Sequence, residues 1–235
     1  MRLNTGTSGF SYDEWKGSFY PENLPAAERL RFYAARFAAV EVNNTFYRLP
    51  DPDVLHHWTT QVPAGFTFAV KASMSITHMR RLRNAAEPLG RLIAATDVLA
   101  DARGPFLFGL HPNMKKDVGL LSDFLAILPT SIRATFEFRH PSWFDDQVYD
   151  ALRHAHAALC VADTIDVSTP LIPTTAWGYL RLRRERYELD DLLTWVKRIR
   201  GQPWSEAFVF FKHEDAATGP RLASHFDTIF AAPGV

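Results

Sequence analysis

The sequence predicts an α/β protein that folds as a single (β/α)8 barrel of the TIM type over residues 1–235. Short runs of apolar, β-branched and aromatic residues alternate with segments of helical apolar period, and each pair spans about 30 residues, the size of a βαβ repeat. Strands that alternate with helices are parallel, and eight such units close naturally into a barrel. An open doubly wound sheet is the alternative, but Gly6-Thr7-Ser8-Gly9 lacks the glycine spacing of a dinucleotide-binding loop.

The expected strands are short apolar runs that contain few charges before their last residues. Eight runs fit this description along the chain. They are LNTGTS (3–8), AVEVN (39–43), FTFAVKA (66–72), FLFGLH (106–111), ATFEFR (134–139), ALCVAD (158–163), GYLRLR (178–183) and AFVFFK (207–212).

The expected helices carry apolar residues at intervals of three and four. Asp51-Pro52 and the Asp145-Asp146 pair are typical of helix starts. Residues 164–177, TIDVSTPLIPTTAW, have no helical period and contain two prolines, so we expect an irregular crossover between strands six and seven. The seven expected helices are 26–37, 51–62, 91–102, 119–128, 145–157, 190–200 and 220–231.

Composition indicates a globular protein, because apolar residues make up 47% and charged residues 22% of the chain. No apolar run is long enough to cross a bilayer, and the start MRLNTGTSGF lacks the apolar region of a signal peptide. We therefore expect a cytoplasmic protein with no membrane partner. The single cysteine, Cys160, excludes an internal disulfide and lies in an apolar strand, where it is expected to be a small buried side chain.

The formal net charge is zero, with 26 basic and 26 acidic residues. A protein that binds nucleic acid mainly through bulk charge is clearly basic, so the composition does not favour nucleic acid as the partner. A small or polymeric anionic ligand would have to bind through a local patch.

Polar residues collect at the ends of the expected strands, which is where a barrel gathers its active site. Alternation places Glu41 with Asn43, Glu137 with Arg139, and Arg181 with Arg183 on one face each. The apolar residues at positions 40, 42, 136, 138, 180 and 182 then face the helices. The polar residues at strand ends are Glu41, Asn43, Lys71, His111, Glu137, Arg139, Asp163, Arg181, Arg183 and Lys212.

A carboxylate such as Glu41 inside an apolar strand needs a partner, because an unpaired buried charge is very costly. We expect Lys71, Arg139 or Arg181 to neutralise it at the barrel mouth. These charges could form a ligand site, or they could be structural ion pairs that hold strands in register.

Two loops near the expected mouth allow a structural and a functional interpretation. His78 and the Arg80, Arg81 and Arg83 group follow strand three, as a solvated basic face or as a phosphate clamp. The aromatic residues in FSYDEWKGSFYP follow strand one and either pack the loop or stack on a ring of a ligand. They are Tyr12, Trp15, Phe19 and Tyr20.

Several reaction chemistries are compatible with these residue types. Glu41 and Glu137 could be paired carboxylates as in glycosidases, and Lys71 could be a Schiff-base lysine if apolar neighbours lower its pKa. No HExxH or nucleophile-elbow motif occurs and no motif requires a cofactor, although a divalent metal stays open. The residues of suitable type for zinc are Glu41, His111, Glu137, His140 and Asp163.

Five strings resemble the domain-of-unknown-function family 72, the YecE-like proteins, from about residue 3 to about residue 225. They are GTSGFSYDEWKGSFYP, FAAVEVNNTFYRLP, FTFAVKASMSITH, FEFRHPSWF and YLRLR. The resemblance implies a TIM-type barrel without an established activity, similar in shape to endonuclease IV-type barrels, and hence DNA or phosphodiester binding. The site residues that it implies are Glu41, Asn43, Thr45, Tyr47, Lys71, His78, Glu137, Arg139, His140, Trp143 and Arg181.

The chain departs from the family pattern after three strands. Where the family usually has LPP, this chain has Leu110-His111-Pro112, and where the family has RLHG, it has Arg181-Leu182-Arg183-Arg184. After the eighth strand, Lys212-His213 occupies a position where the family tends to carry asparagine. The loss of the His-Gly pair puts any role of that loop in doubt. The added basic residues favour anion binding, or a divergent member with an altered substrate.

These observations predict a barrel enzyme that binds, and hydrolyses, a phosphate-containing or other anionic substrate at the mouth. Arg181, Arg139 and Lys71 would hold the anion, Glu41 or Glu137 would be the general base, and His140 or His78 the acid. The expected catalytic residues are Glu41, Lys71, Glu137 and His140, and the expected substrate-binding residues are Asn43, Thr45, Tyr47, His78, Arg139, Trp143, Asp163 and Arg181.

The alternatives are a non-catalytic nucleic-acid binder that uses the arginines at 80–83 and the rim aromatics, and a scaffold for other proteins. For the enzyme, Glu137→Gln and Lys71→Met are each expected to abolish turnover while changing stability by no more than about 1–2 kcal/mol.

Overall fold

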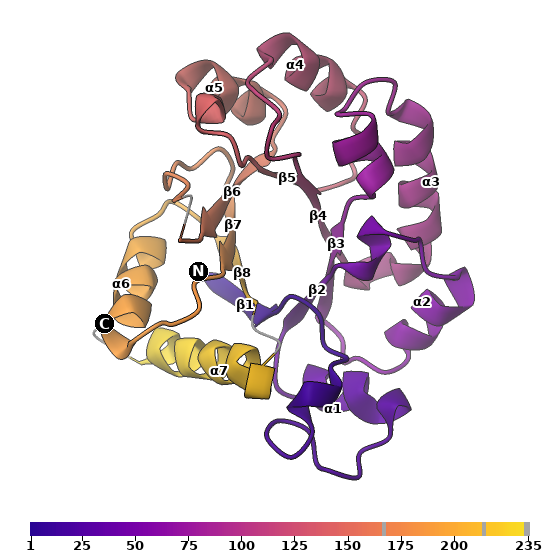
Figure 1. Cartoon of the computed structure of the whole chain (residues 1–235), viewed down its shortest axis with the longest axis vertical. Coiled ribbons are helices and arrows are strands. Elements are labelled where there is room, and N and C mark those ends of the chain that lie inside the picture. Colours follow the sequence, from indigo (N-terminus) through magenta and orange to yellow (C-terminus); the bar gives the residue numbers. More distant parts are fainter. Residues whose placement is uncertain (166–167, 213–214, 233–235) are drawn as a thin grey trace.

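Eight parallel strands surround a central axis in the computed structural model, which describes residues 1–165, 168–212 and 215–232 (Figure 1). From β2 to β8 each strand pairs with its neighbour in sequence, and β8 pairs with β1. This order confirms the predicted (β/α)8 barrel. The strands are β1 (Arg2–Thr7), β2 (Ala39–Val42), β3 (Thr67–Lys71), β4 (Arg103–Gly109), β5 (Ala134–Glu137), β6 (Ala158–Asp163), β7 (Trp177–Leu182) and β8 (Glu206–Phe211).

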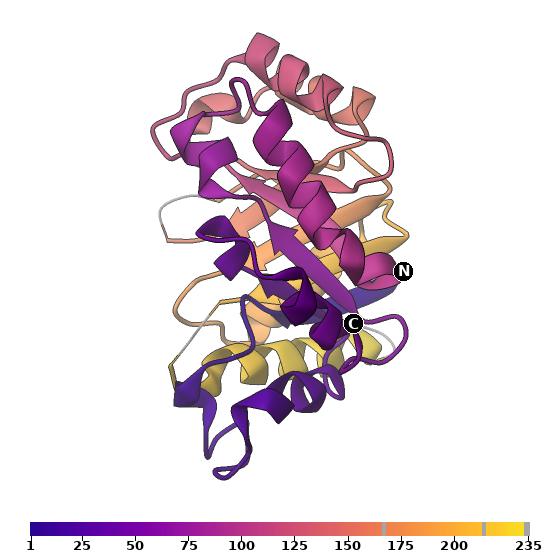
Figure 2. The same cartoon turned by 90° about the vertical axis from the view of Figure 1, so that its right-hand side faces the viewer.

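The helices lie outside the strands, as both views show (Figure 1, Figure 2). The helix predicted over 91–102 begins earlier, at Ala86, and its last six residues form a tighter turn. Residues 164–165 and 168–176 contain no helix, as predicted for the crossover between β6 and β7. The helices are α1 (Arg29–Ala34), α2 (Pro52–Thr59), α3 (Ala86–Thr96), α4 (Val118–Ala126), α5 (Asp146–His154), α6 (Leu189–Arg200) and α7 (Thr218–Ala231).

The barrel closes between β1 and β2 through a tyrosine rather than a full ladder. The two strands share an isolated bridge at Ser8 and Glu41. Below it, the buried Tyr33 hydroxyl accepts from Thr7 N at 2.7 Å and donates to the Ala39 carbonyl at 3.0 Å. Gly6 makes room for this arrangement, since a Cβ there would lie 1.9 Å from the Ala39 oxygen. The hydroxyl thus forms hydrogen bonds with the Thr7 amide and the Ala39 carbonyl, which the missing ladder between β1 and β2 would otherwise leave without a partner.

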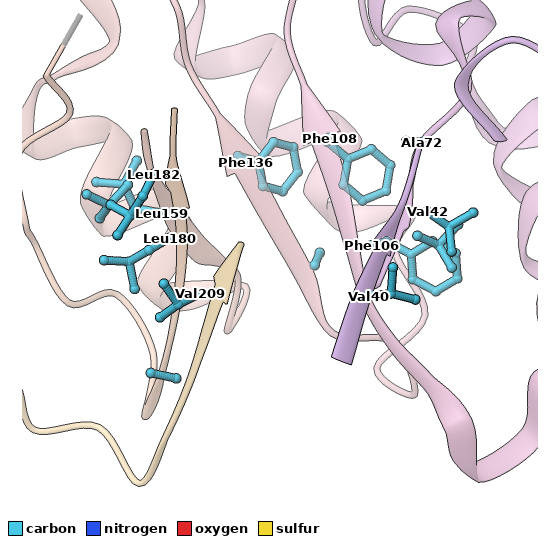
Figure 3. Close-up of a cluster of buried hydrophobic side chains, with 14 of the residues drawn as sticks. Val40, Val42, Ala72, Phe106, Phe108, Phe136, Leu159, Leu180, Leu182 and Val209 are labelled. Carbon is cyan, nitrogen blue, oxygen red and sulfur yellow. The ribbon is translucent and has the colours of Figure 1, made fainter. Parts of the chain in front are cut away.

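The core has two layers, one on each side of the strands. The outer layer packs strand residues against the helices and includes Val40, Val42, Phe136, Leu180 and Leu182 (Figure 3). Phe138 lies in the same layer, so all six positions predicted to face the helices do so. The inner layer fills the barrel with Ala39, Ala69, Leu107, Cys160, Tyr179, Phe208 and Phe210.

The carboxyl ends of the strands meet on one side of the molecule, toward the left in Figure 2. The residues that follow the strands therefore form one mouth, as in other barrels of this type. Trp15 and Tyr20, in the loop after β1, are 1% exposed, so they pack that loop. No helix in the described part of the chain is both long enough and apolar enough to span a membrane.

Candidate functional site

Arg181 is the centre of the polar cluster inside the barrel. It points inward from β7, is 2% exposed, and holds two carboxylates at once. Its Nη2 donates to Glu41 Oε1 at 2.8 Å and its Nη1 donates to Glu137 Oε2 at 2.6 Å. The buried carboxylates of β2 and β5 are therefore compensated by one guanidinium from β7, one of the three partners that the sequence offered.

Glu41 has a full set of hydrogen-bond donors besides Arg181. The Tyr179 hydroxyl donates to Oε2 at 2.7 Å, and the Ser8 hydroxyl and Asn43 Nδ2 donate to Oε1 at 2.7 and 3.1 Å. Burial acts to raise the pKa of Glu41, but Arg181 and these hydroxyls outweigh it, so the pKa is below its ordinary value. Glu41 is thus an ionised side chain whose lone pairs are occupied.

Glu137 sits among three guanidinium groups. Besides Arg181, Arg139 Nη2 and Arg183 Nη1 each lie 3.6 Å from its carboxylate oxygens. Gly109 on β4 leaves room for this carboxylate, because a Cβ there would be 3.2 Å from Oε2. Burial opposes ionisation, but the arginines lower the pKa of Glu137 to about 2. A carboxylate this acidic accepts a proton poorly at neutral pH, so the general-base role expected for Glu41 or Glu137 loses its physical support.

Lys71 ends β3 and extends toward the same cluster. Its Nζ lies 4.4 Å from the centre of the Phe46 ring, and no carboxylate oxygen of the described residues comes within 4.0 Å of it. Burial and Arg181 lower the pKa of Lys71 to about 8, against the opposing effect of Glu41 and Glu137. An appreciable fraction of this amine is therefore unprotonated near pH 8.

Two histidines pack together on the rim beside Lys71. The His78 and His111 rings lie 5.2 Å apart, and His78 Nδ1 is 2.9 Å from the Thr77 hydroxyl. Burial, Arg139 and His111 lower the pKa of His78 to about 4, so its ring is neutral at pH 7. His140 Nδ1 accepts from Ser142 N at 3.2 Å at the start of the turn Pro141–Trp143.

Positive charge outweighs negative charge in this cluster. Four cationic side chains from three strands and their following residues accompany two carboxylates, and both carboxylates are bound by Arg181. Arg139 and Arg183 are 31% and 23% exposed, so their outer donors face the opening. We call this group the cationic mouth, and it consists of Lys71, Arg139, Arg181 and Arg183 with Glu41 and Glu137.

Three residues expected to bind substrate have structural roles. Trp143 is 0% exposed, and its indole donates to the Met114 carbonyl at 2.6 Å. The buried Thr45 hydroxyl donates to the Val42 and Lys71 carbonyls. Asp163 accepts hydrogen bonds from Tyr187, Trp195 and Arg184 on the outer side of β6. The hydrogen bonds of Trp143, Thr45 and Asp163 within the protein account for these side chains without a ligand, and their contact with substrate stays a prediction.

The remaining expected residues lie at or near the mouth. Asn43 touches Glu41, and Tyr47 is 78% exposed beside Phe46, with the two rings 5.0 Å apart. Arg80 and Arg81 are exposed in the loop after β3.

Sequence reasoning missed Tyr179 and Ser8 as partners of Glu41. Tyr179 lies two residues before Arg181 on the same strand, so alternation places both side chains inside the barrel. Ser8 directly follows β1, where the other strand-end residues were found. Both signals were present in the sequence.

The departures from the family pattern have different outcomes. Arg183 joins the cationic mouth, whereas Arg184 turns away to Asp163 and Asp191. His111 packs against His78. His213 lies outside the described residues.

A bound metal ion needs several His, Cys, Asp or Glu side chains around one point. Within residues 1–165, 168–212 and 215–232, no group of three or more His, Cys, Asp or Glu side chains is placed to hold a metal ion. Of the residues of suitable type, Asp163 faces away from the barrel interior. The Glu41 carboxylate already accepts hydrogen bonds from Arg181, Tyr179 and Ser8. The divalent metal that the sequence left open has no assembled ligand set in this part of the chain.

Comparison with known proteins identifies the family. Residues 4–234 match the family described as "Protein of unknown function DUF72". The chain belongs to the DUF72 family. A DUF72 family protein of Thermotoga maritima has the same fold, with a TM-score of 0.88 and 24% identity over 99% of this chain and 100% of that one. A DUF72 family protein of Enterococcus faecalis superposes with a TM-score of 0.83 and 16% identity over 98% and 96%.

This DUF72 chain also matches curated proteins in sequence. UPF0759 protein YecE of Escherichia coli K12 is 31% identical over 116 residues, which are 49% of this chain and 43% of that protein. The match thus spans less than half the length of this relative. UPF0759 protein YunF of Bacillus subtilis is 22% identical over 213 residues, or 83% of this chain and 74% of that protein. These descriptions establish the family and the fold, and they name no substrate.

Proposed function

We propose that this DUF72 protein binds a phosphate-containing or other anionic substrate at the mouth of its barrel and hydrolyses it. One observation supports the binding most strongly. Arg139 and Arg183 both approach the Glu137 carboxylate, and with Arg181 and Lys71 they make four cationic side chains around two carboxylates, which leaves an excess of positive charge at the opening.

The two outer arginines are suited to an anion because their contacts with Glu137 are long. Each guanidinium lies 3.6 Å from that carboxylate, whereas Arg181 lies at 2.6 Å. Arg139 and Arg183 therefore keep donors that an incoming phosphate or carboxylate can accept from. The planar fork of an arginine matches two oxygens of such a group.

Hydrolysis needs a group that takes a proton from water at the working pH. Glu41 and Glu137 are poor candidates, because their pKa values are lowered. The amine of Lys71, whose pKa is about 8, is a better proton acceptor near neutral pH, whereas a pKa of about 4 makes His78 a weak base. In the proposed reaction, Lys71 activates water while the arginines stabilise charge on the substrate.

Anion binding is tested by isothermal titration with inorganic phosphate. Arg139→Ala and Arg183→Ala should each weaken binding by about tenfold or more, because a hydrogen bond to a charged group contributes about 1.5–3 kcal/mol. Arg91→Ala is the matched control, since Arg91 is an exposed arginine of α3 that pairs with Glu87. Equal affinities in all four proteins would rule out the cationic mouth as the anion site.

Hydrolysis is tested separately by incubation with phosphomonoesters and phosphodiesters. Turnover should require Lys71, so Lys71→Met should lose it while phosphate still binds measurably to the arginines. Turnover that survives in Lys71→Met at the wild-type rate would remove Lys71 from the mechanism.

A second candidate, nucleic-acid binding without catalysis, has one observation in its favour. Arg80 and Arg81 are exposed in the loop after β3, and Tyr47 and Met79 are 78% and 73% exposed. An exposed aromatic beside arginines can stack on a base of a single strand. This candidate predicts binding to DNA or RNA that falls steeply with salt and weakens in Tyr47→Ala. Absent or salt-independent binding would exclude it.

A further inference from the structure

Lys71 differs from the other cations of the mouth because it is partly buried and has no carboxylate partner in the described part of the chain. Arg181, by contrast, binds two carboxylates. We infer that the amine of Lys71 is a nucleophile that forms an imine with an aldehyde or ketone whose anionic group is held by Arg139 and Arg183. This inference rests on the anion binding proposed above, makes a carbonyl carbon the reacting group of the substrate, and replaces the water-activating role proposed for Lys71 with nucleophilic attack.

The backbone that carries Lys71 is held firmly on both sides. The Thr45 hydroxyl donates to the Lys71 carbonyl at 2.7 Å, and Ala72 N donates to the Leu107 carbonyl at 2.8 Å. The amine itself lies over the Phe46 ring at 4.4 Å. A nucleophile needs this kind of support, since a small displacement reduces the rate strongly.

Burial, together with Arg181 and Arg139, favours the unprotonated form of Lys71. Glu41 of β2 and Glu137 of β5 face it, but both are engaged by Arg181 of β7. Arg139 and the neutral His78 complete its titratable surroundings. With burial, this setting lowers the pKa of Lys71 to about 8, as it does for lysines that attack carbonyl groups in other enzymes.

The chemical step needs no oxidant or reductant. The nitrogen lone pair forms a bond to the carbonyl carbon, the two hydrogens of the amine pass to the carbonyl oxygen, and the carbon–oxygen bond breaks to release water. The product is an imine, so one amine and one carbonyl group give one imine and one water molecule.

The spacing of the cations limits the substrate to a short molecule. Arg139 and Arg183 approach the same carboxylate of Glu137, and Lys71 is influenced by that carboxylate and by Arg139. We therefore expect a substrate whose anionic group and carbonyl carbon lie a few bonds apart. Small 2-oxo acids and phosphorylated short aldehydes have this arrangement.

Reductive trapping tests the inference. The protein is incubated at pH 8 with sodium cyanoborohydride and either pyruvate, glycolaldehyde phosphate or uncharged glycolaldehyde, and adducts are located by peptide mass spectrometry. We expect a single fast adduct on Lys71 that forms at least about tenfold faster with one of the anionic probes than with glycolaldehyde. The faster of the two anionic probes shows whether a carboxylate or a phosphate is preferred.

The matched variants are Lys71→Arg, which keeps the charge, and Lys115→Arg, which changes an exposed lysine in the loop after β4. Only Lys71→Arg should abolish the fast adduct. Adducts spread evenly over exposed lysines of the wild-type protein would overturn the inference, and this result does not depend on whether a variant folds.

The outcome for the inference is separable from that for the proposed function. If phosphate binds to the wild-type protein and weakens with Arg139→Ala, but no fast adduct forms on Lys71, only the inference fails. If phosphate does not bind at all, the proposed function fails, and the inference loses the anion site on which it rests.

Discussion

Glu137 and Arg181 form an ion pair without access to water, and this changes what a substitution there should do. The sequence predicted that Glu137→Gln would alter stability by no more than about 1–2 kcal/mol. Because the carboxylate is 2% exposed and faces three arginines, its removal leaves buried positive charge uncompensated. We now expect Glu137→Gln to lower the free energy of unfolding by about 3–5 kcal/mol in urea titrations. Glu87→Gln, at an exposed site on α3, should change it by less than about 0.5 kcal/mol.

The lowered pKa of Glu137 also predicts how stability depends on pH. Its pKa is about 2 in the folded protein and 4.5 in its ordinary state. The stabilisation from this group is therefore complete above pH 4.5 and is lost as pH falls toward 2. Urea unfolding between pH 6 and pH 2.5 should show this loss in the wild-type protein and a shallower slope in Glu137→Gln. If the free energy of unfolding depended on pH equally in both proteins, the arginines would not lower the pKa of Glu137.

Lys71 should have the opposite dependence. Its pKa is about 8 in the folded protein against an ordinary 10.5, so the protonated amine disfavours folding. This penalty is present in full below pH 8 and disappears as pH rises to 10.5. Lys71→Met should therefore be more stable than the wild type at pH 7, and the difference should shrink by pH 10. A variant that is less stable at pH 7 would indicate that the amine has a stabilising partner.

At the scale of elements, the seam between β1 and β2 depends on Tyr33. Tyr33→Phe leaves the Thr7 amide and the Ala39 carbonyl without their shared partner, so we expect a loss of about 1–3 kcal/mol in the free energy of unfolding. Tyr149→Phe is the control, because the hydroxyl of this α5 residue has no hydrogen bond to the described residues. A loss of the same size in both variants would mean that the seam hydroxyl has no special role.

The strands and helices were predictable because their signals are local. An apolar run such as ALCVAD defines β6, and the helical period defines α6, whatever the rest of the chain does. The start of α3 at Ala86 was missed, since Pro88 and Gly90 are residues that usually interrupt a helix. The Gly6 and Tyr33 seam could not be predicted, because it joins residues from different elements.

The candidate site was predictable only in part, and Asp163 shows why. Alternation along β6 puts Asp163 on the same face as Leu159 and Val161, which pack outward. The face of the strand therefore predicts the direction of this side chain better than its position at the strand end. Trp143 and Thr45 follow their strands, where the period gives no direction for a side chain. Glu41, Glu137 and Arg181 obey the period and met as predicted.

At the scale of the whole molecule, the mouth exists because the barrel closes. Arg181 reaches Glu41 across 140 positions of the sequence, and Arg139 and Arg183 come from different strands. The chain has no net charge, yet closure concentrates four cations around two carboxylates. A local excess of this kind binds a small anion without making the protein a general binder of polyanions.

The most direct measurement of this claim is an anomalous difference map from crystals soaked in tungstate, a heavy analogue of phosphate. We predict the strongest peak at the mouth, where the tungstate oxygens lie within about 3 Å of donors on Arg139 and Arg183, and its disappearance in a crystal of the Arg139→Ala variant. An empty mouth with tungstate bound only at exposed arginines such as Arg80 and Arg81 would contradict the account.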